Sequence, residues 1–131
     1  MEKSEKKLID DVHIDKKRPN EKADVYNVIN TLREYDQVIT AEQVARLLGR
    51  LGQQDNIQFI LNDVGIYLKD FDGEGLFAIM ESCKFAKTKR LAVENLAKHL
   101  PEDTTAEAKE KCVETISSTF EKNKAKKVLG I

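Results

Sequence analysis

The residues whose types and spacing suggest a specific chemistry lie at positions 70–81. Carboxylate oxygens occupy positions 1, 3, 5 and 12 of this twelve-residue segment, on Asp70, Asp72, Glu74 and Glu81. Gly75 occupies position 6, where the chain must turn sharply. Calcium takes six to eight hard oxygen ligands, held by a tight turn and a late carboxylate. This spacing predicts a calcium-binding loop.

The same residues suit a second interpretation, an acidic turn between two helices. Asp72 would then lie near a helix N-terminus, where it can accept a hydrogen bond from a backbone amide and where the helix dipole favours negative charge. Gly73 and Gly75 are typical turn residues. Both interpretations need one helix before residue 70 and another after it.

Apolar residues recur along most of the chain at the i, i+3, i+4, i+7 spacing of amphipathic helices. The stripes are Val25, Val28, Ile29 and Leu32; Val44, Leu47, Leu48 and Leu51; Ile57, Ile60, Leu61, Val64 and Leu68; Leu76, Ile79, Met80 and Cys83; Ala92, Val93, Leu96 and Leu100; and Cys112, Val113, Ile116 and Phe120. No strand-like alternation competes with them. The sequence therefore predicts an all-α fold, a compact bundle of about six short amphipathic helices.

Residues with capping chemistry mark the expected ends of these helices. Three helix starts carry the spacing of a capping box: Thr40 with Gln43, Asp55 with Gln58, and Thr104 with Glu107. Thr88 marks a further start, and Gly52 and Pro101 mark two ends. The first helix is expected over residues 21–35.

The apolar stripes also repeat along the chain. A shift of about 32 positions places Leu47, Leu48 and Leu51 on Ile79, Met80 and Cys83, and Leu61, Val64 and Leu68 on Val93, Leu96 and Leu100. This period is the length of one αα-hairpin. Stacked hairpin repeats and a bundle of similar hairpins both remain open at this point.

The run DFDGEGLFAIME at positions 70–81 resembles the calcium-binding loop of EF-hand proteins. The resemblance implies that Asp70, Asp72 and Glu74 are side-chain ligands, that Leu76 offers its carbonyl, and that Glu81 closes the site with both oxygens. EF-hands usually occur in pairs, and residues 25–52 resemble a degenerate partner with a loop several residues too short. The implied cofactor is calcium; without the resemblance, no cofactor is expected.

Composition limits the protein class. The 131 residues are enough for one domain, and 22 basic residues nearly cancel 23 acidic ones. Cys83 and Cys112 are too few for a disulfide framework, so we expect a reducing, cytoplasmic environment. No apolar run is long enough to cross a bilayer, and no signal peptide is present, so we expect no membrane contact.

The chain divides into three expected parts. Residues 1–20 alternate charges around a short apolar patch and end near Pro19, so we expect a flexible charged arm. Residues 21–127 form the helical domain. Residues 128–131 form an apolar C-terminal tip after a run of lysines.

The functional expectation is a non-enzymatic protein–protein interaction module with an adaptor or regulatory role. No catalytic motif is present, neither His13 nor His99 has a partner in the local sequence, and no small-molecule substrate is indicated. Phe59, Ile66 and Tyr67 add apolar surface beyond the stripe of their helix, which suits contact with another protein or a second copy. A calcium-responsive protein is one alternative. Nucleic-acid binding through the basic residues 84–98 and the C-terminal lysines is another, which the balanced net charge does not favour.

Overall fold

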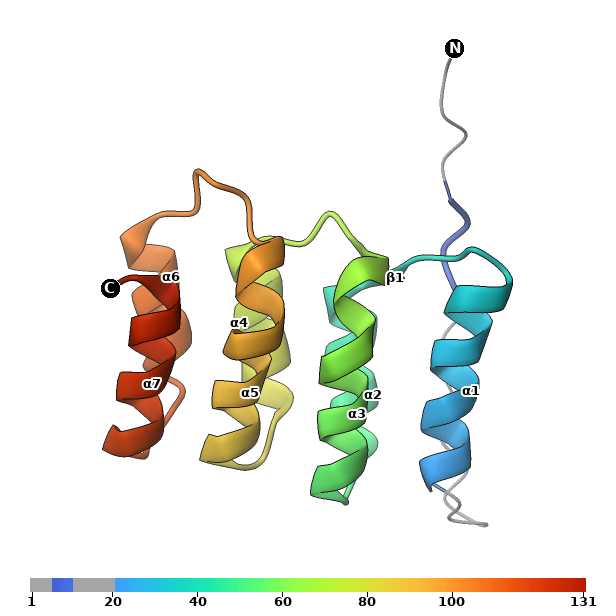
Figure 1. The fold of residues 1–131 in the computed structure, drawn as a ribbon, viewed down its shortest axis with the longest axis horizontal. Coiled ribbons are helices and arrows are strands. Elements are labelled where there is room, and N and C mark those ends of the chain that lie inside the picture. The colour runs from blue at the N-terminus through green and yellow to red at the C-terminus, as the bar shows by residue number, and fades with distance from the viewer. Residues whose placement is uncertain (1–5, 11–20) are drawn as a thin grey trace.

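The computed structural model of the chain describes residues 6–10 and 21–131, and it confirms the all-α prediction (Figure 1). The described residues form seven α-helices: α1 (Glu21–Glu34), α2 (Ala41–Arg50), α3 (Gln54–Val64), α4 (Gly73–Ser82), α5 (Ala86–Leu96), α6 (Ala106–Val113) and α7 (Thr119–Leu129). Short 3₁₀ turns, Gly65–Tyr67 and Ala97–His99, follow α3 and α5. Two short strands, β1 (Ile39–Thr40) and β2 (Leu68–Lys69), pair in parallel.

The expected sixth helix is two helices, so the described chain has seven rather than about six. α6 ends at Val113, and α7 begins at Thr119. Ser118 is the N-cap of α7, and its hydroxyl accepts a hydrogen bond from the Glu121 amide at 3.4 Å. Ile116 lies in the connection between them, and its side chain is fully buried. Phe120 is 65% exposed in the first turn of α7, so it does not continue the buried stripe.

One of the three expected capping boxes forms at the expected residues. Thr40 accepts a hydrogen bond from the Gln43 amide at 3.1 Å, and the Gln43 side chain accepts one from the Thr40 amide at 3.0 Å. The other starts are displaced: α3 begins at Gln54, before Asp55, and Thr105 rather than Thr104 caps α6. α5 begins at Ala86, which places Thr88 inside its first turn.

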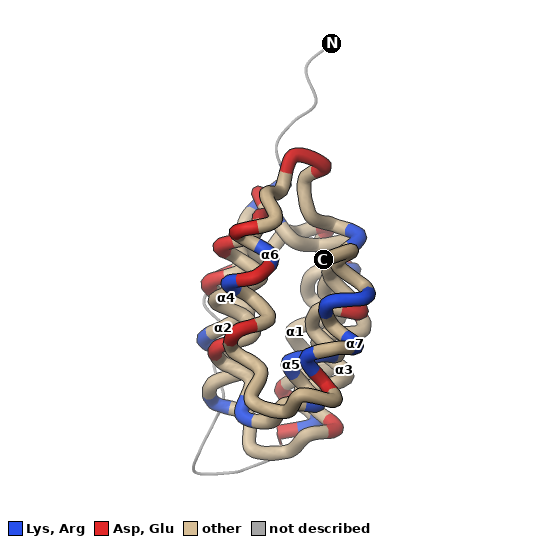
Figure 2. The backbone as a smooth tube through the Cα atoms, turned by 90° about the vertical axis from the view of Figure 1, so that its left-hand side faces the viewer, with Lys and Arg blue, Asp and Glu red and all other residues tan. Residues whose placement is uncertain are grey.

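The helices form two layers of stacked hairpins. The first layer contains α2, α4 and α6, and the second layer contains α1, α3, α5 and α7 (Figures 1 and 2). The bounds of α2 and α3 shifted by 32 residues coincide with those of α4 and α5, and a shift of 33 residues takes α5 to α7. The repeated stripes therefore correspond to repeated αα-hairpins that lie side by side.

The core lies between the two layers, and equivalent positions of successive hairpins fill it. Buried sets at equivalent positions are Leu48, Met80 and Val113; Leu51, Cys83 and Ile116; and Val64, Leu96 and Leu129. Each layer turns its apolar stripe toward the other, as amphipathic helices must to bury that stripe.

Residues 6–10, part of the expected flexible arm, pack against the helical domain. The Ile9 amide donates to the Val38 carbonyl at 2.8 Å, and the Val38 amide donates to the Lys7 carbonyl at 2.9 Å. The Gln43 side chain donates to the Ile9 carbonyl at 3.0 Å, and the Ile9 side chain is 6% exposed. Ile9 is thus held by backbone and side-chain hydrogen bonds and by burial of its own side chain. The rest of the arm, residues 1–5 and 11–20, lies outside the described residues.

The helical domain extends beyond the expected boundary at residue 127. α7 continues through Leu129, whose side chain is 5% exposed and completes the core. Gly130 then ends the helix in the left-handed conformation, with φ of 72°, which glycine adopts at little cost. Only the last two residues lie beyond α7.

Candidate functional site

The predicted calcium loop is folded as a short turn followed by a helix. α4 begins at Gly73, position 4 of the expected twelve-residue loop. Asp72 is the N-cap of α4, and its carboxylate accepts a hydrogen bond from the Gly75 amide at 2.8 Å. Asp70 precedes it in the left-handed conformation and is exposed. Leu76 is fully buried in the core.

The expected ligands are not brought together by this arrangement. Glu74 lies in the first turn of α4 and Glu81 near its end, and both are exposed. Seven residues of α-helix separate their Cα atoms by about 10 Å along the axis. Within residues 6–10 and 21–131, no group of three or more His, Cys, Asp or Glu side chains is placed to hold a metal ion. The residues therefore do not fit the loop that the EF-hand resemblance implies.

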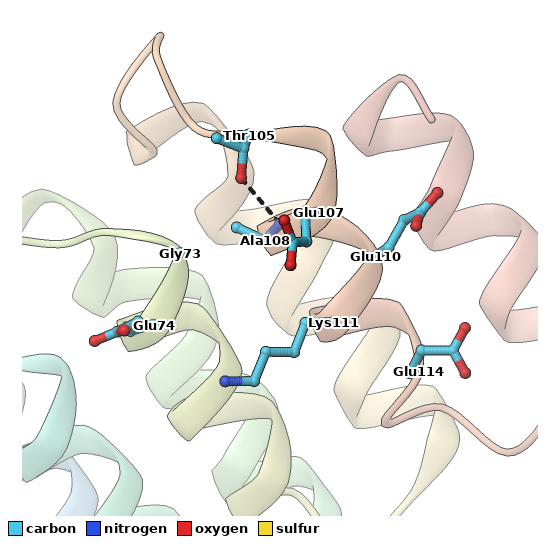
Figure 3. A pocket seen from close by; sticks show the side chains of 8 residues that line it. All are labelled: Gly73, Glu74, Thr105, Glu107, Ala108, Glu110, Lys111 and Glu114. Atoms are coloured by element: carbon cyan, nitrogen blue, oxygen red, sulfur yellow. Dashed lines mark hydrogen bonds between the residues drawn. The ribbon is translucent and has the colours of Figure 1, made fainter.

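A hollow of about 490 Å³ lies beside the first turn of α4, between α4 and α6 (Figure 3). Its lining consists of Gly73, Glu74, Thr105, Glu107, Ala108, Glu110, Lys111 and Glu114. Four of these eight residues are glutamates. Lys111 extends toward α4, where its Nζ lies 4.4 Å from the centre of the Phe77 ring. The lining contains no thiol or imidazole, so it offers no nucleophile of that kind.

The two thiols and the described histidine serve packing. Burial raises the pKa of Cys83 and of Cys112 to about 11, with nearby lysines opposing the shift, so both remain thiols at neutral pH. The His99 ring packs against Gly65, where a Cβ atom would lie 2.6 Å from Nε2. None of the three lines the hollow beside α4. His13 lies outside the described residues.

The second layer presents a surface of different composition. Its outer face, turned away from the first layer, includes Asp55 and Asn62 on α3, Lys87 and Glu94 on α5, and Phe120 and Lys127 on α7, all exposed. Each pair is spaced by seven residues and lies opposite the buried stripe of its helix.

Large exposed apolar side chains occur on the helices of the second layer and next to the ends of those helices. In the described part of the chain, the helices of the second layer carry three large exposed ones: Tyr26, Phe120 and Val128. Ile66, Phe85 and Ile131 adjoin the ends of α3, α5 and α7 and are exposed too. The helices α2, α4 and α6 of the first layer carry none. The Tyr26 and Phe59 rings pack with centres 4.5 Å apart, which joins α1 to α3 at the surface.

The helices of the second layer differ in their total charge, counted over buried and exposed residues together. α1 and α3 together contain five acidic and two basic residues, whereas α5 and α7 contain seven basic and two acidic residues. Those two acidic residues, Glu94 and Glu121, both pair with Arg90, at 2.8 and 2.5 Å. The basic segments that the sequence singled out are thus neighbours in space, on the side of the molecule that carries α5 and α7 in Figure 2.

The sequence signalled this face only in part. Phe59 and Ile66 are apolar residues that lie outside the apolar stripe of α3, and their spacing in the sequence showed this. The exposure of Tyr26 and Phe120 was not visible in the sequence, because it depends on which helices lie beside α1 and α7.

Comparison of the chain with protein-family models, curated proteins and solved structures finds no match. Within the described ranges, no helix combines the length and the apolar character needed to cross a membrane. Function is therefore inferred from the geometry of the chain itself.

Proposed function

We propose that this chain is a non-enzymatic protein-interaction module that binds its partner on the outer face of the second layer. The observation that carries the proposal is the distribution of exposed apolar side chains, which in the described helices occur in the second layer and not in the first. Single exposed apolar residues are ordinary, so the proposal depends on their uneven distribution between the two layers.

The composition of the face supports this role. Protein interfaces combine aromatic anchors with a polar rim, and Tyr and Phe side chains are enriched in them. Tyr26 is 42% exposed beside Phe59, and Phe120 is 65% exposed at the other end of the layer. Charged and amide side chains such as Asp55, Asn62 and Lys87 lie between them.

The helical stack would hold this face in a fixed shape. Arg90 of α5, half-buried, bridges to Glu121 of α7 at 2.5 Å, and the Tyr26–Phe59 contact links α1 to α3. A face whose anchors are already ordered loses little conformational entropy on binding. The proposal requires no catalytic group and no small-molecule substrate.

Site-specific photo-cross-linking tests the proposal. A photoreactive residue at Asn62, on the outer face, is compared with one at Glu42, which is exposed on α2 of the first layer. In an extract of the cells that make the protein, we expect discrete protein adducts from position 62 and not from position 42. Phe120→Ser should weaken the adducts without lowering the melting temperature, since this side chain is mostly exposed. Equal adducts from both positions, or none from position 62, would contradict the proposal.

A further inference from the structure

We infer that the partner on the outer face is a second copy of the same chain, in a dimer with two-fold symmetry. This inference rests on the proposed function, because it names the partner of that face. A surface binds its own copy across a two-fold axis only when its two halves are complementary. On the two central helices of the outer face, Asp55 of α3 and Lys87 of α5 meet that condition, because both are exposed and they carry opposite charges.

The symmetry follows from the order of the helices. The second layer runs α1, α3, α5, α7 from one end of the stack to the other (Figure 1). A two-fold axis parallel to the helices, passing between α3 and α5, places α3 over α5 of the second copy and α1 over α7. The exposed Asp55 of each copy then faces the helix that carries Lys87 of the other, and the contact occurs twice. A partner of one uniform charge would complement only one of these two residues.

The repeat sets the register of this contact. Such an axis preserves height along the helices, so equivalent positions of successive hairpins come to face each other. Asp55 and Lys87 are equivalent, 32 residues apart, and both are exposed in the first turn of their helices. Asp55 of each copy therefore lies opposite Lys87 of the other.

The same register pairs a large side chain with a small one. Phe120, 33 residues after Lys87, occupies the equivalent position of α7, and Ala23 occupies it on α1. The exposed Phe120 ring of one copy thus lies over Ala23 of the other, beside its exposed Tyr26. Aromatic side chains are common anchors of protein interfaces.

The available area suits a stable dimer. A helix of eleven residues, the length of α3, α5 and α7, is about 16 Å long, and four helices spaced by about 10 Å cover about 40 Å. The projected face of about 650 Å² is close to the ~800 Å² per partner of a standard interface, and side-chain relief adds to it. The net charge of −1 imposes little repulsion between copies.

Sedimentation velocity with charge-reversed variants tests this inference. We expect the wild-type chain to dimerise as its concentration rises, and Asp55→Lys or Lys87→Asp to raise the dimer Kd by about tenfold or more, because each reversal acts at two symmetric contacts. The double variant carrying both reversals should recover the wild-type Kd, since both pairs re-form with opposite sign. Glu42→Lys, on the first layer, should leave the Kd unchanged. Thermal melts confirm that each variant is folded.

Three results would overturn the inference: a wild-type chain that stays monomeric into the millimolar range, a dimer insensitive to both single reversals, or a double variant that does not recover. A monomeric chain with photo-adducts to another protein at position 62 would leave the proposed function standing without self-association. A monomer whose salt-sensitive retention on an oligonucleotide is lost in Lys87→Asp would overturn the inference in favour of a polyanion.

Discussion

Among single residues, Glu21 ties α1 to the first hairpin. Its carboxylate accepts hydrogen bonds from the amides of Gly52 and Gln53, at 2.8 and 3.0 Å, and from the side chain of Asn56 at 2.7 Å. Burial acts to raise the pKa of Glu21, but these hydrogen bonds and the charge of Lys84 outweigh it, so the pKa lies below its ordinary value. The ionised carboxylate therefore stabilises the fold.

The stabilisation by Glu21 should depend on pH in a defined direction. Because the folded pKa is depressed, the contribution is fully present above the unfolded pKa and is lost as the pH falls through the folded pKa. We expect Glu21→Gln to lower the free energy of unfolding by about 1 kcal/mol near neutral pH. The difference should shrink in acid, where the wild-type carboxylate becomes protonated. Urea unfolding across pH measures it, with the exposed Glu34→Gln as control; a pH-independent difference would contradict this account.

Two glycines in different surroundings provide a matched pair. A Cβ at Gly65 would lie 2.6 Å from Nε2 and 2.8 Å from Cδ2 of His99, whereas a Cβ at Gly49, within α2, would meet no atom within 4 Å. We expect Gly65→Ala to destabilise the fold by about 1–3 kcal/mol through overpacking. Gly49→Ala should stabilise it by about 0.5–1 kcal/mol, because alanine loses less entropy in a helix. Chemical denaturation measures both; effects of the same sign would show that His99 does not pack as described.

At this scale the sequence predicted local contacts and missed distant ones. The Thr40–Gln43 capping box was predictable because its members are three residues apart. Gln43 also bonds Ile9, 34 residues away, and Glu21 bonds the connection between α2 and α3 more than 30 residues away. The spacing of apolar residues along the sequence does not predict such contacts, because they depend on how the helices stack.

Among elements, the start of α4 determines how far apart the acidic residues of positions 70–81 lie. The acidic spacing is compatible with a metal loop or with a capped turn, and the two differ in where the helix begins. Here Asp72 caps α4 and Gly75 packs closely, since a Cβ at that position would lie 2.9 Å from the Cβ of Ala41. The helix therefore starts early and separates Glu74 from Glu81.

Calcium is expected to leave the stability of this fold unchanged. A ligand that binds only the folded state stabilises it by about 2.7 kcal/mol at a hundred times its Kd. Because the carboxylates of residues 70–81 do not converge, we expect no such gain, and a thermal melt in millimolar calcium should match one in chelator. An increase in melting temperature that Glu81→Gln removes would instead support the EF-hand interpretation.

The N-terminal segment should contribute to stability through one side chain. Ile9 is 6% exposed and Leu8 is 41% exposed, although they are adjacent. We expect Ile9→Ala to cost about 2 kcal/mol or more, as for other buried isoleucines, and Leu8→Ala to cost within about 0.5 kcal/mol. Urea unfolding compares them. Equal small losses would show that residues 6–10 do not stay docked, as the sequence suggested.

The sequence predicted most helices but not this segment. Two adjacent apolar residues among charges give no period, and the pairing of Ile9 with Val38 joins parts of the chain that only the fold brings together. The split between α6 and α7 was missed for a related reason. In the last hairpin, Lys109 stands at the position equivalent to Val44 and Leu76, and Lys126 stands at the position equivalent to Leu61 and Val93. The last hairpin therefore has fewer apolar residues in its stripe.

For the whole molecule, the repeat explains the regular spacing of the helices. A period of 32 residues was visible in the sequence, and the structure shows it as stacked hairpins. Lys109 and Lys126 lie in the last hairpin, where no further described hairpin covers its flank, and both are half-buried. Lysines at these positions reduce the apolar surface of this hairpin.

Stacking predicts a gradient of local stability along the chain. α4 packs against α2 on one side and α6 on the other, whereas α6 has a first-layer neighbour only in α4 among the described helices. Stability in such stacks is close to a sum of hairpin and interface terms, so elements with two interfaces should open least often. In hydrogen-exchange mass spectrometry we expect the amides of α4 to exchange more slowly than those of α6. The comparison stays within the first layer because a partner on the outer face would protect the second layer directly. Equal protection of α4 and α6 would show that the whole stack opens as a single cooperative unit.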